Sequence, residues 1–316
     1  MSEGGTAPEE LLNRPEYVVQ AQLTVESTVG GGAFATAARR WFEEGFGTLG
    51  GELRERLLAR SVPPGAVPGA GERRWRGETG EVWGESSWGF DMVGAWHGYT
   101  DEIWQELLGV LQRVPVYAAF DVNELQRLSE SVVRPWYPGL ELQAVTWLPG
   151  DDNPHADTWF GVKLNGSAGL LVGTPAAEQA LLALVRGVAD LWGPAYGEIS
   201  TDMYGHIGYG TAVERERGLV ITDTMRRSRQ FLRGYGWLTI VPQEIGDRLG
   251  GLPELRASGA FVEVEPLARG GYWLLASERL IDYTPDRAEA VARVLGPMLP
   301  AAYRPTGRTN DPSRSG

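Results

Sequence analysis

Apolar and polar residues alternate along several stretches of the chain, a pattern typical of β-strands with one buried face. In residues 17–27, Val, Ala and Leu alternate with Gln, Thr and Glu, which predicts a strand. Similar but shorter patterns predict strands at residues 87–95, 116–122, 140–148, 159–164, 237–241, 261–266 and 272–276.

Other stretches carry apolar residues at helical spacing. Residues 33–60 follow this spacing with a break between Gly45 and Gly51, which predicts two helices or one kinked helix. Thr100 predicts the N-cap of a helix that ends near residue 111. Thr174 and Pro175 suit the N-cap and first position of a long helix, which Gly193 ends. Shorter helices are expected at residues 222–231, 242–249 and 285–295.

The order of these elements predicts the fold class. Helices and strands interleave irregularly, and several strands follow one another directly. This favours an α+β fold with mixed or antiparallel sheets and helices packed on one face over a doubly wound parallel sheet. Both parts of the chain contain helices and strands, which also predicts two α+β halves of similar size, residues 15–134 and 135–304. Residues 1–14 and 305–316 are polar, and we expect them to be disordered tails.

Composition excludes several kinds of site. The 316 residues include no Cys and only 3 His, so a disulfide framework, a Cys nucleophile and a Cys-ligated metal are excluded. The net charge of −12 argues against nucleic acid as a partner, because that binding relies on a basic surface. No apolar run approaches the roughly 20 residues needed to span a bilayer, and residues 1–13 lack the features of a signal peptide. We therefore expect a cytoplasmic protein that binds no membrane.

The polar motifs predict no cofactor and no metal. Gly30-Gly31-Gly32 lies between a strand and a helix but matches no phosphate-binding motif. The alternating Asp151, Asn153, His155 and Asp157 suggest a calcium loop, yet Ala156 and Val162 occupy the positions of the required Gly and Glu. We interpret this stretch as a solvated loop. No nucleophile motif of the G-x-S-x-G type occurs, so we expect no catalytic residues and no enzyme activity.

Charge is distributed unevenly. Residues 77–157 hold 14 acidic and 3 basic residues together with several Trp and Tyr, whereas residues 214–233 hold 6 Arg and 3 acidic residues. A solvated acidic face would explain the first stretch. The alternative is an acidic, aromatic surface that docks a basic protein, with carboxylates that steer the encounter and aromatic anchors. Its candidate residues are Trp83, Glu85, Trp88, Asp91, Trp96, Asp101, Glu102, Asp151, Asp152 and Asp157.

Residues 226–252 resemble a segment of bacterial type VI immunity-family proteins, which are α+β domains. The resemblance lies in an aromatic-Gly-Trp-Leu-Thr strand, a short helix and a Leu-Gly-Gly turn. The matching residues are Tyr235, Trp237, Leu238, Thr239, Leu249, Gly250 and Gly251. The similarity extends over about residues 140–304. It implies a protein that binds and neutralises a cognate toxin delivered by a neighbouring cell, and it supplies no catalytic residues.

Three hypotheses follow. The first is a non-enzymatic immunity protein that binds a basic toxin through the acidic, aromatic surface. The second is a carboxylate-dependent enzyme acting on a carbohydrate or small polar substrate, which requires a concave site and a carboxylate with a raised pKa. The third is a structural component of a bacterial assembly. The missing catalytic motifs and the immunity-like segment favour the first.

Overall fold

One antiparallel sheet connects the parts of the chain that the structure describes. The computed structural model describes residues 17–60, 79–91, 94–129, 132–135, 139–148, 157–203 and 209–301. The strands are β1 (Tyr17–Glu26), β2 (Val82–Gly89), β3 (Ala95–Gly98), β4 (Tyr117–Ser129), β5 (Val132–Pro135), β6 (Leu140–Trp147), β7 (Trp159–Ser167), β8 (Tyr196–Met203), β9 (Leu238–Val241), β10 (Glu263–Pro266) and β11 (Tyr272–Leu275).

The strands follow the order β10-β11-β9-β8-β1-β7-β6-β4-β2-β3, and β5 pairs with β4 beside this path. All neighbours are antiparallel. β1 therefore lies near the middle of the sheet although it comes first in the sequence. The arrangement confirms the predicted α+β class.

The helices connect and cover these strands. The α-helices are α2 (Ser27–Gly30), α3 (Phe34–Glu44), α4 (Gly51–Leu58), α5 (Asp101–Leu111), α6 (Ala168–Val172), α7 (Pro175–Trp192), α8 (Ala212–Glu216), α9 (Ile221–Arg226), α10 (Gln243–Arg248), α11 (Gly251–Ala257) and α12 (Pro285–Leu295). A π-helix, Gly45–Leu49, joins α3 to α4, where the sequence predicts a break. Short 3₁₀ turns occur at Gly31–Ala33, Leu280–Asp282 and Gly296–Met298.

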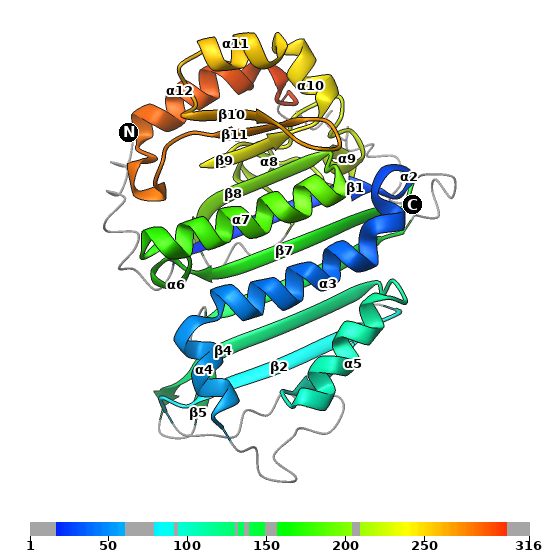
Figure 1. Cartoon of the computed structure of the whole chain (residues 1–316), viewed down its shortest axis with the longest axis vertical. Coiled ribbons are helices and arrows are strands. Elements are labelled where there is room, and N and C mark those ends of the chain that lie inside the picture. The colour runs from blue at the N-terminus through cyan, green and yellow to red at the C-terminus, as the bar shows by residue number, and fades with distance from the viewer. Residues whose placement is uncertain are drawn as a thin grey trace, which may run out of the picture.

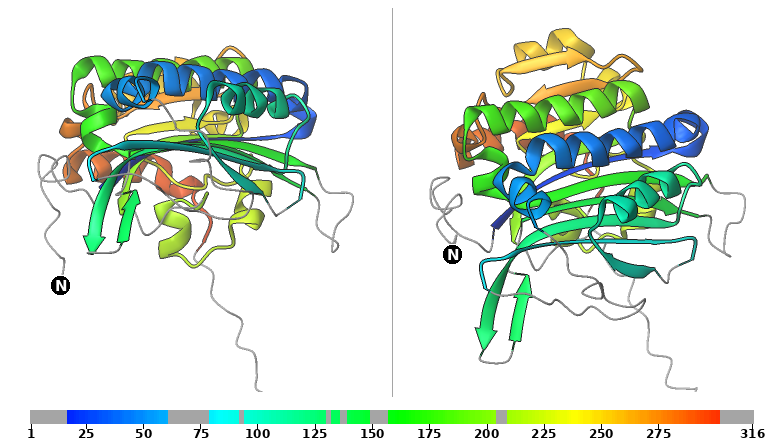
Figure 2. Two further views of the ribbon diagram at one scale, coloured as in Figure 1. Left: turned by 90° about the horizontal axis from the view of Figure 1, so that it is seen from below. Right: turned by 60° about the horizontal axis from the view of Figure 1, so that its bottom comes forward.

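Helices α3, α4, α5 and α7 lie side by side on one face of the sheet (Figure 1). The main core forms there, where Leu23 of β1 and Leu142 of β6 pack with Trp41 of α3 and Val185 of α7. A second core joins α10, α11 and α12 to β9, β10 and β11 through residues such as Ile245, Leu255 and Val291. Figure 2 shows α8, α9 and α12 on the side of the sheet opposite α3 and α7.

β1 is buried on both of its faces. Val19, Ala21, Leu23 and Val25 enter the main core, as the alternation predicts. The polar face is also covered: Gln22 and Thr24 are fully buried. The sequence predicts a strand with one buried face. This is wrong because the polar face is covered as well, for example by Arg233, whose guanidinium lies 3.4 Å from the hydroxyl of Thr24.

Most predicted elements are present, and their caps explain why. The Oγ1 of Thr100 accepts a hydrogen bond from the N–H of Ile103 at 3.2 Å, and Thr174 caps α7 in the same way. The strand predicted at 87–95 is instead a hairpin of β2 and β3, and the helix predicted at 222–231 is shorter, ending at Arg226. β8 was not predicted, because its acidic and hydroxyl residues give no apolar alternation.

The predicted boundary between residues 134 and 135 falls at the end of β5. β1, from the first predicted half, pairs with β7 and β8 from the second. The two segments thus contribute strands to the same sheet. Among the described residues, no helix is both long and apolar enough to cross a bilayer.

Candidate functional site

The face of the sheet opposite α3 and α7 carries a row of polar side chains. Strand register places Glu85, Asp121, Glu141, Asn165 and Gln20 directly opposite one another on consecutive strands, so all five lie on this face. Asn165 donates to Glu141 at 2.6 Å. All but Glu141 are buried. This polar sheet face therefore concentrates carboxylates and amides, side chains that can bind ligands or transfer protons.

Lys163 occupies the neighbouring row of the polar sheet face, opposite Gln143 and Gln22. It is the chain's single lysine and is fully buried. Burial lowers the pKa of its ammonium group to about 8, while the charges of Glu141 and Glu198 oppose that decrease. The ammonium lies 5.7 Å from the centre of the Tyr209 ring. Lys163 is thus a buried cation close to losing its proton at neutral pH.

Glu198 on β8 is held through both carboxylate oxygens. Tyr196 donates its hydroxyl to one oxygen and Gln22 donates its amide to the other, each at 2.7 Å. Burial raises the pKa of Glu198, and these two hydrogen bonds oppose the increase. Because its oxygens are already engaged, we interpret Glu198 as part of the internal polar network.

Arg233 and Glu214 form a buried ion pair beside this network. The Nε and Nη2 atoms of Arg233 contact the two oxygens of Glu214 at 2.8 and 3.1 Å. Arg233 also donates to the carbonyl of Tyr209 at 2.6 Å and lies over the Tyr196 ring. Glu214 accepts from the N–H of Thr211, which completes a capping box at α8. The pair therefore fixes α8 to the sheet.

These contacts give the polar sheet face a structural character. Both oxygens of Glu141 accept hydrogen bonds, from Gln143 and Asn165, as both oxygens of Glu198 do. Among the described residues, no group of three His, Asp or Glu is placed to hold a metal ion. Glu141 and Glu198 are therefore held in place by hydrogen bonds, whereas one side-chain oxygen each of Gln20 and Asn165 is buried without one.

The predicted aromatic anchors do not share one surface. Trp83, Glu85 and Trp96 lie on the polar sheet face, where Trp83 and Glu85 are buried. Trp88 lies on the helix-covered face instead, and its ring stacks on His97 with centroids 4.5 Å apart. Strand alternation separates them, since Trp83 and Trp88 differ by an odd number of residues.

Of the predicted acidic residues that the structure describes, Glu85 is buried, and the others are exposed: Asp91, Asp101, Glu102 and Asp157. Asp91 follows the end of β2 and Asp157 precedes the start of β7. Because these strands are antiparallel to their neighbours, both residues lie where the same ends of the strands meet solvent. Asp101 and Glu102 begin α5, whose first turn suits negative charge. Asp151 and Asp152 lie outside the described residues, as do Asn153 and His155 of the loop considered for calcium.

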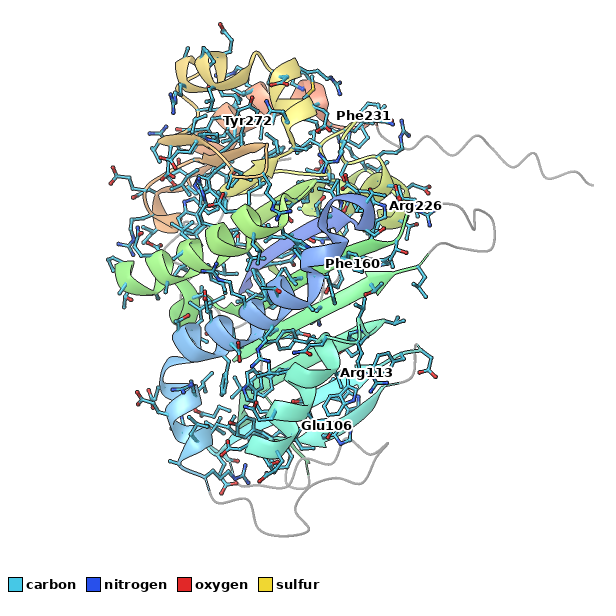
Figure 3. The ribbon with its side chains drawn as sticks, turned by 45° about the vertical axis from the view of Figure 1, so that its right-hand side comes forward. Glu106, Arg113, Phe160, Arg226, Phe231 and Tyr272 are labelled. Carbon is cyan, nitrogen blue, oxygen red and sulfur yellow. The ribbon has the colours of Figure 1, made fainter. Side chains whose placement is uncertain are left out.

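Exposed apolar side chains lie at these same strand ends. The N–H of Val116 donates to Gly89 at 3.0 Å, and the N–H of Thr146 donates to Val116 at 2.9 Å, so the ends of three strands meet there. Phe90, Val114 and Leu148 extend from these ends and are 45%, 40% and 59% exposed. We call these three residues the strand-end surface. In Figure 3, Arg113 and Glu106 of the adjoining α5 region lie on this side of the molecule.

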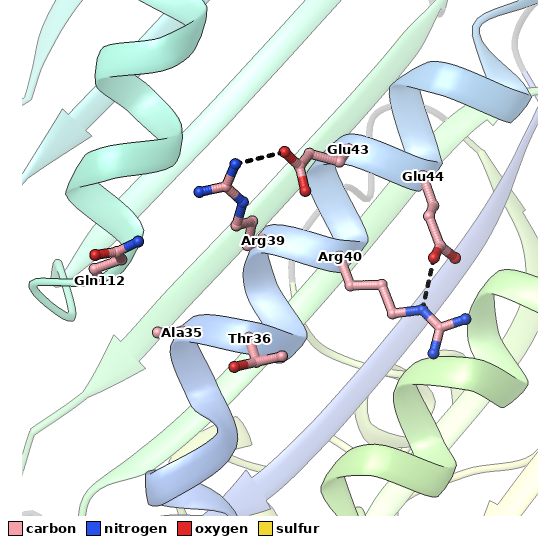
Figure 4. A pocket seen from close by; sticks show the side chains of 7 residues that line it. All are labelled: Ala35, Thr36, Arg39, Arg40, Glu43, Glu44 and Gln112. Atoms are coloured by element: carbon pink, nitrogen blue, oxygen red, sulfur yellow. Dashed lines mark hydrogen bonds and ion pairs between the residues drawn. The ribbon is translucent and has the colours of Figure 1, made fainter.

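Two grooves lie elsewhere. One, of about 460 Å³, runs between α3 and the end of α5 (Figure 4). Its walls hold two ion pairs, and in each pair the partners are one helical turn apart. Arg39 contacts Glu43 at 2.8 Å, and Arg40 contacts Glu44 at 2.9 Å. A second groove of about 480 Å³ lies beside α9 and Phe231. The four charged side chains of the first groove are thus paired with one another.

The immunity-like residues are structural. Trp237, Leu238 and Thr239 are fully buried, and the indole of Trp237 donates to the carbonyl of Ser277 at 2.9 Å. Gly250 and Gly251 have φ angles of 92° and 71°, which suit glycine and turn the chain from α10 into α11. Tyr235 and Leu249 are half-buried and pack against the second core. The motif therefore marks a fold rather than a binding surface.

The fold is similar to that of a solved protein, "Pseudomonas aeruginosa T6SS protein PA0821", where T6SS denotes the type VI secretion system. The match covers 90% of this chain and 73% of that chain, with a TM-score of 0.53 and 10% sequence identity. At that identity the similarity concerns the fold. No family model and no curated protein sequence matches the chain.

Sequence reasoning missed Lys163 and the strand-end surface. A signal for Lys163 was available, because a single lysine among 28 arginines points to a position where arginine does not fit. Phe90, Val114 and Leu148 are far apart in the sequence, and strand pairing brings them together. No local pattern indicates that.

Proposed function

We propose that this protein is a non-enzymatic immunity protein that binds and neutralises a toxin delivered by a type VI secretion system. The fold similarity to a T6SS protein, which extends over 90% of the chain, is the observation that carries the proposal. The resemblance of residues 235–239 and 249–251 to immunity-family proteins agrees with it at the level of the fold. Such a protein acts in the cytoplasm of the cell it protects and needs no cofactor.

The chemistry of the described residues supports a binding role. The carboxylates of Glu141, Glu198 and Glu214 are engaged by amide, hydroxyl or guanidinium donors. A basic toxin suits a chain with a net charge of −12, because opposite charges raise association rates. Both features fit a rigid protein that presents an acidic exterior to its partner.

The test is growth competition between neighbouring cells. Recipients that lack this gene are mixed with parental attackers, and survival is compared with that of recipients expressing the protein. We expect the recipients that lack the gene to be killed, and expression in the cytoplasm to restore survival. Attackers with an inactivated secretion apparatus are the control and should leave all recipients alive. Equal survival of both recipients before an active attacker would contradict the proposal.

A second candidate is a structural component of the secretion apparatus, since the neighbour's name specifies the system and not a role within it. The same strains distinguish the two. Loss of an apparatus component disables the attacker that lacks it. Loss of an immunity protein affects the recipient and leaves secretion by the attacker intact.

A further inference from the structure

Three buried amide oxygens of the polar sheet face accept no hydrogen bond from the chain. They are Oε1 of Gln20, Oε1 of Gln22 and Oδ1 of Asn165. Gln20 is 2% exposed, and Gln22 and Asn165 are fully buried. A buried polar atom without a partner destabilises the folded state, and native proteins contain few such atoms. Three of them on one face therefore indicate a partner that is not part of the chain.

Strand register brings these side chains into one small area. Gln20 lies directly opposite Asn165, and Gln22 lies directly opposite Lys163, the next pair on the same face. Side chains directly opposite one another have Cβ atoms about 5 Å apart, and same-face neighbours along a strand are about 7 Å apart. We call these four residues the β1–β7 strip. A few small molecules above the strip can therefore reach all three oxygens.

Two of the amides are held in a fixed orientation. The Nδ2 atom of Asn165 donates to Glu141 on β6 at 2.6 Å, and the Nε2 atom of Gln22 donates to Glu198 on β8 at 2.7 Å. The oxygen and the nitrogen of an amide point in diverging directions, so each oxygen turns away from the strand that its nitrogen contacts. The oxygen of Asn165 thus turns toward β1, and that of Gln22 turns toward β7. Both are directed into the strip between these strands.

The β1–β7 strip is covered and already holds a positive charge. The ring of Tyr209 lies over it, since the ring centre is 5.7 Å from the Lys163 ammonium and a Cβ atom on Gly161 would lie 3.2 Å from the ring. Lys163 supplies a cation on which the charges of Glu141 and Glu198 act, so a neutral donor is favoured over a second cation. The nearly complete burial of the three amides favours a molecule as small as water.

We propose that the β1–β7 strip is an internal hydration site, in which ordered water molecules donate hydrogen bonds to Gln20, Gln22 and Asn165. A water molecule has two O–H donors, so three acceptors need more than one water. Buried waters of this kind make about three hydrogen bonds each to polar groups that otherwise lack partners. The waters are then part of the folded sheet and explain why amides are tolerated inside it. This inference goes beyond the proposed function and does not depend on it.

Gln20 is the best probe of the site, because no hydrogen bond joins its side chain to another described residue. Methionine has a similar size and no amide, so Gln20→Met removes the group that the waters contact and preserves the packing. If waters bind Gln20, the melting temperature should fall by about 2–4 °C. If the amide has no partner, its removal stabilises the fold, so a raised melting temperature overturns the proposal.

Gln112→Met is the matched control. It makes the same substitution at an exposed residue, at the end of α5, and should leave the melting temperature unchanged.

The waters can also be observed directly, in a high-resolution crystal structure of the unaltered full chain. We expect water density about 2.7–3.2 Å from each of the three oxygens. A donor from the chain or an organic molecule in that place would overturn the proposal. Magnetic relaxation dispersion of water oxygen-17 detects waters that stay bound longer than the protein tumbles. The unaltered protein should hold more such waters than Gln20→Met, and equal numbers would count against the site.

Discussion

Arg233 and Glu214 form a two-point ion pair although both side chains are almost completely buried, at 0% and 1% exposure. Water solvates neither charge, so each charge is stabilised only by the other and by nearby hydrogen bonds. The pair links the segment that precedes β9 to α8, and through Thr24 it also contacts β1. It is a structural joint between elements from both ends of the chain.

Replacing one partner of this pair should destabilise the protein strongly. Arg233→Met leaves Glu214 buried without its cation, and we expect a loss of about 3–5 kcal/mol in the free energy of unfolding. Urea denaturation measures it. The double variant with Glu214→Gln should lose less than the two single losses added together, because it leaves no isolated charge. Additive losses would show that the two groups act independently.

Lys163 should titrate near pH 8 in the folded protein. Its pKa is lowered from 10.5 to about 8, so folding is penalised while the group is protonated in both states, at pH below about 8. The penalty disappears as pH rises from 8 to 10.5, and the unfolding free energy should increase by up to about 3 kcal/mol over this range. Because the chain has one lysine, ¹³C-labelled lysine gives a single NMR signal whose midpoint reports this pKa directly.

Lys163→Met provides the comparison for the pH dependence. The variant has no group that titrates at this position, so its unfolding free energy should lack the increase between pH 8 and 10.5. Parallel curves for the two proteins would contradict the assignment. A lysine signal with a midpoint near 10.5 would contradict it as well.

Val114→Gly should stabilise the fold. Val114 adopts a left-handed conformation, with a φ angle of 54°. This conformation costs valine about 1–2 kcal/mol, and the greater freedom of an unfolded glycine offsets about half of this. We therefore expect a gain of about 0.5–1 kcal/mol, seen as a higher melting temperature. Val29→Gly is the matched control: Val29 is 43% exposed and its φ angle is not positive, so glycine should destabilise there. A lower melting temperature for Val114→Gly would refute the strain.

Gly236 explains part of the immunity-like motif. A Cβ atom on this residue would collide with the carbonyl oxygen of Ile199 on β8, a backbone atom that cannot move aside easily. Gly236→Ala should therefore cost about 1–3 kcal/mol of unfolding free energy. Gly109→Ala is the control, because a Cβ there meets no atom within 4 Å and alanine favours helix α5 by about 1 kcal/mol. Equal effects in thermal denaturation would contradict this explanation.

The sequence predicts those elements whose signals are local. Thr100 and Thr174 cap helices because a threonine side chain reaches the N–H three residues ahead, whatever the rest of the chain does. β8 lacks such a signal. Its residues Tyr196, Glu198 and Ser200 form a strand because β1 and β9 supply partners on both sides. Pairing between distant segments is invisible to local periodicity.

The candidate site shows the same division. Exposure of Asp91 and Asp157 follows from their charge and is predictable from the sequence. The assignment of Trp83 and Trp88 to opposite sheet faces depends on their belonging to one continuous strand, β2. The strand-end surface requires the register of three strands, and the φ angle of Val114 is a property of the folded chain alone.

The central place of β1 also governs the order in which the molecule can form during synthesis. Residues of β1 leave the ribosome before those of the other described strands, yet their partners in β7 and β8 are made only after β2 to β6 have been translated. Until then, β1 has hydrogen-bonding groups on both sides and no neighbour. The nascent chain must therefore keep Val19, Leu23 and Val25 from self-association until Met203 has emerged. The centre of the sheet can therefore form only late in translation.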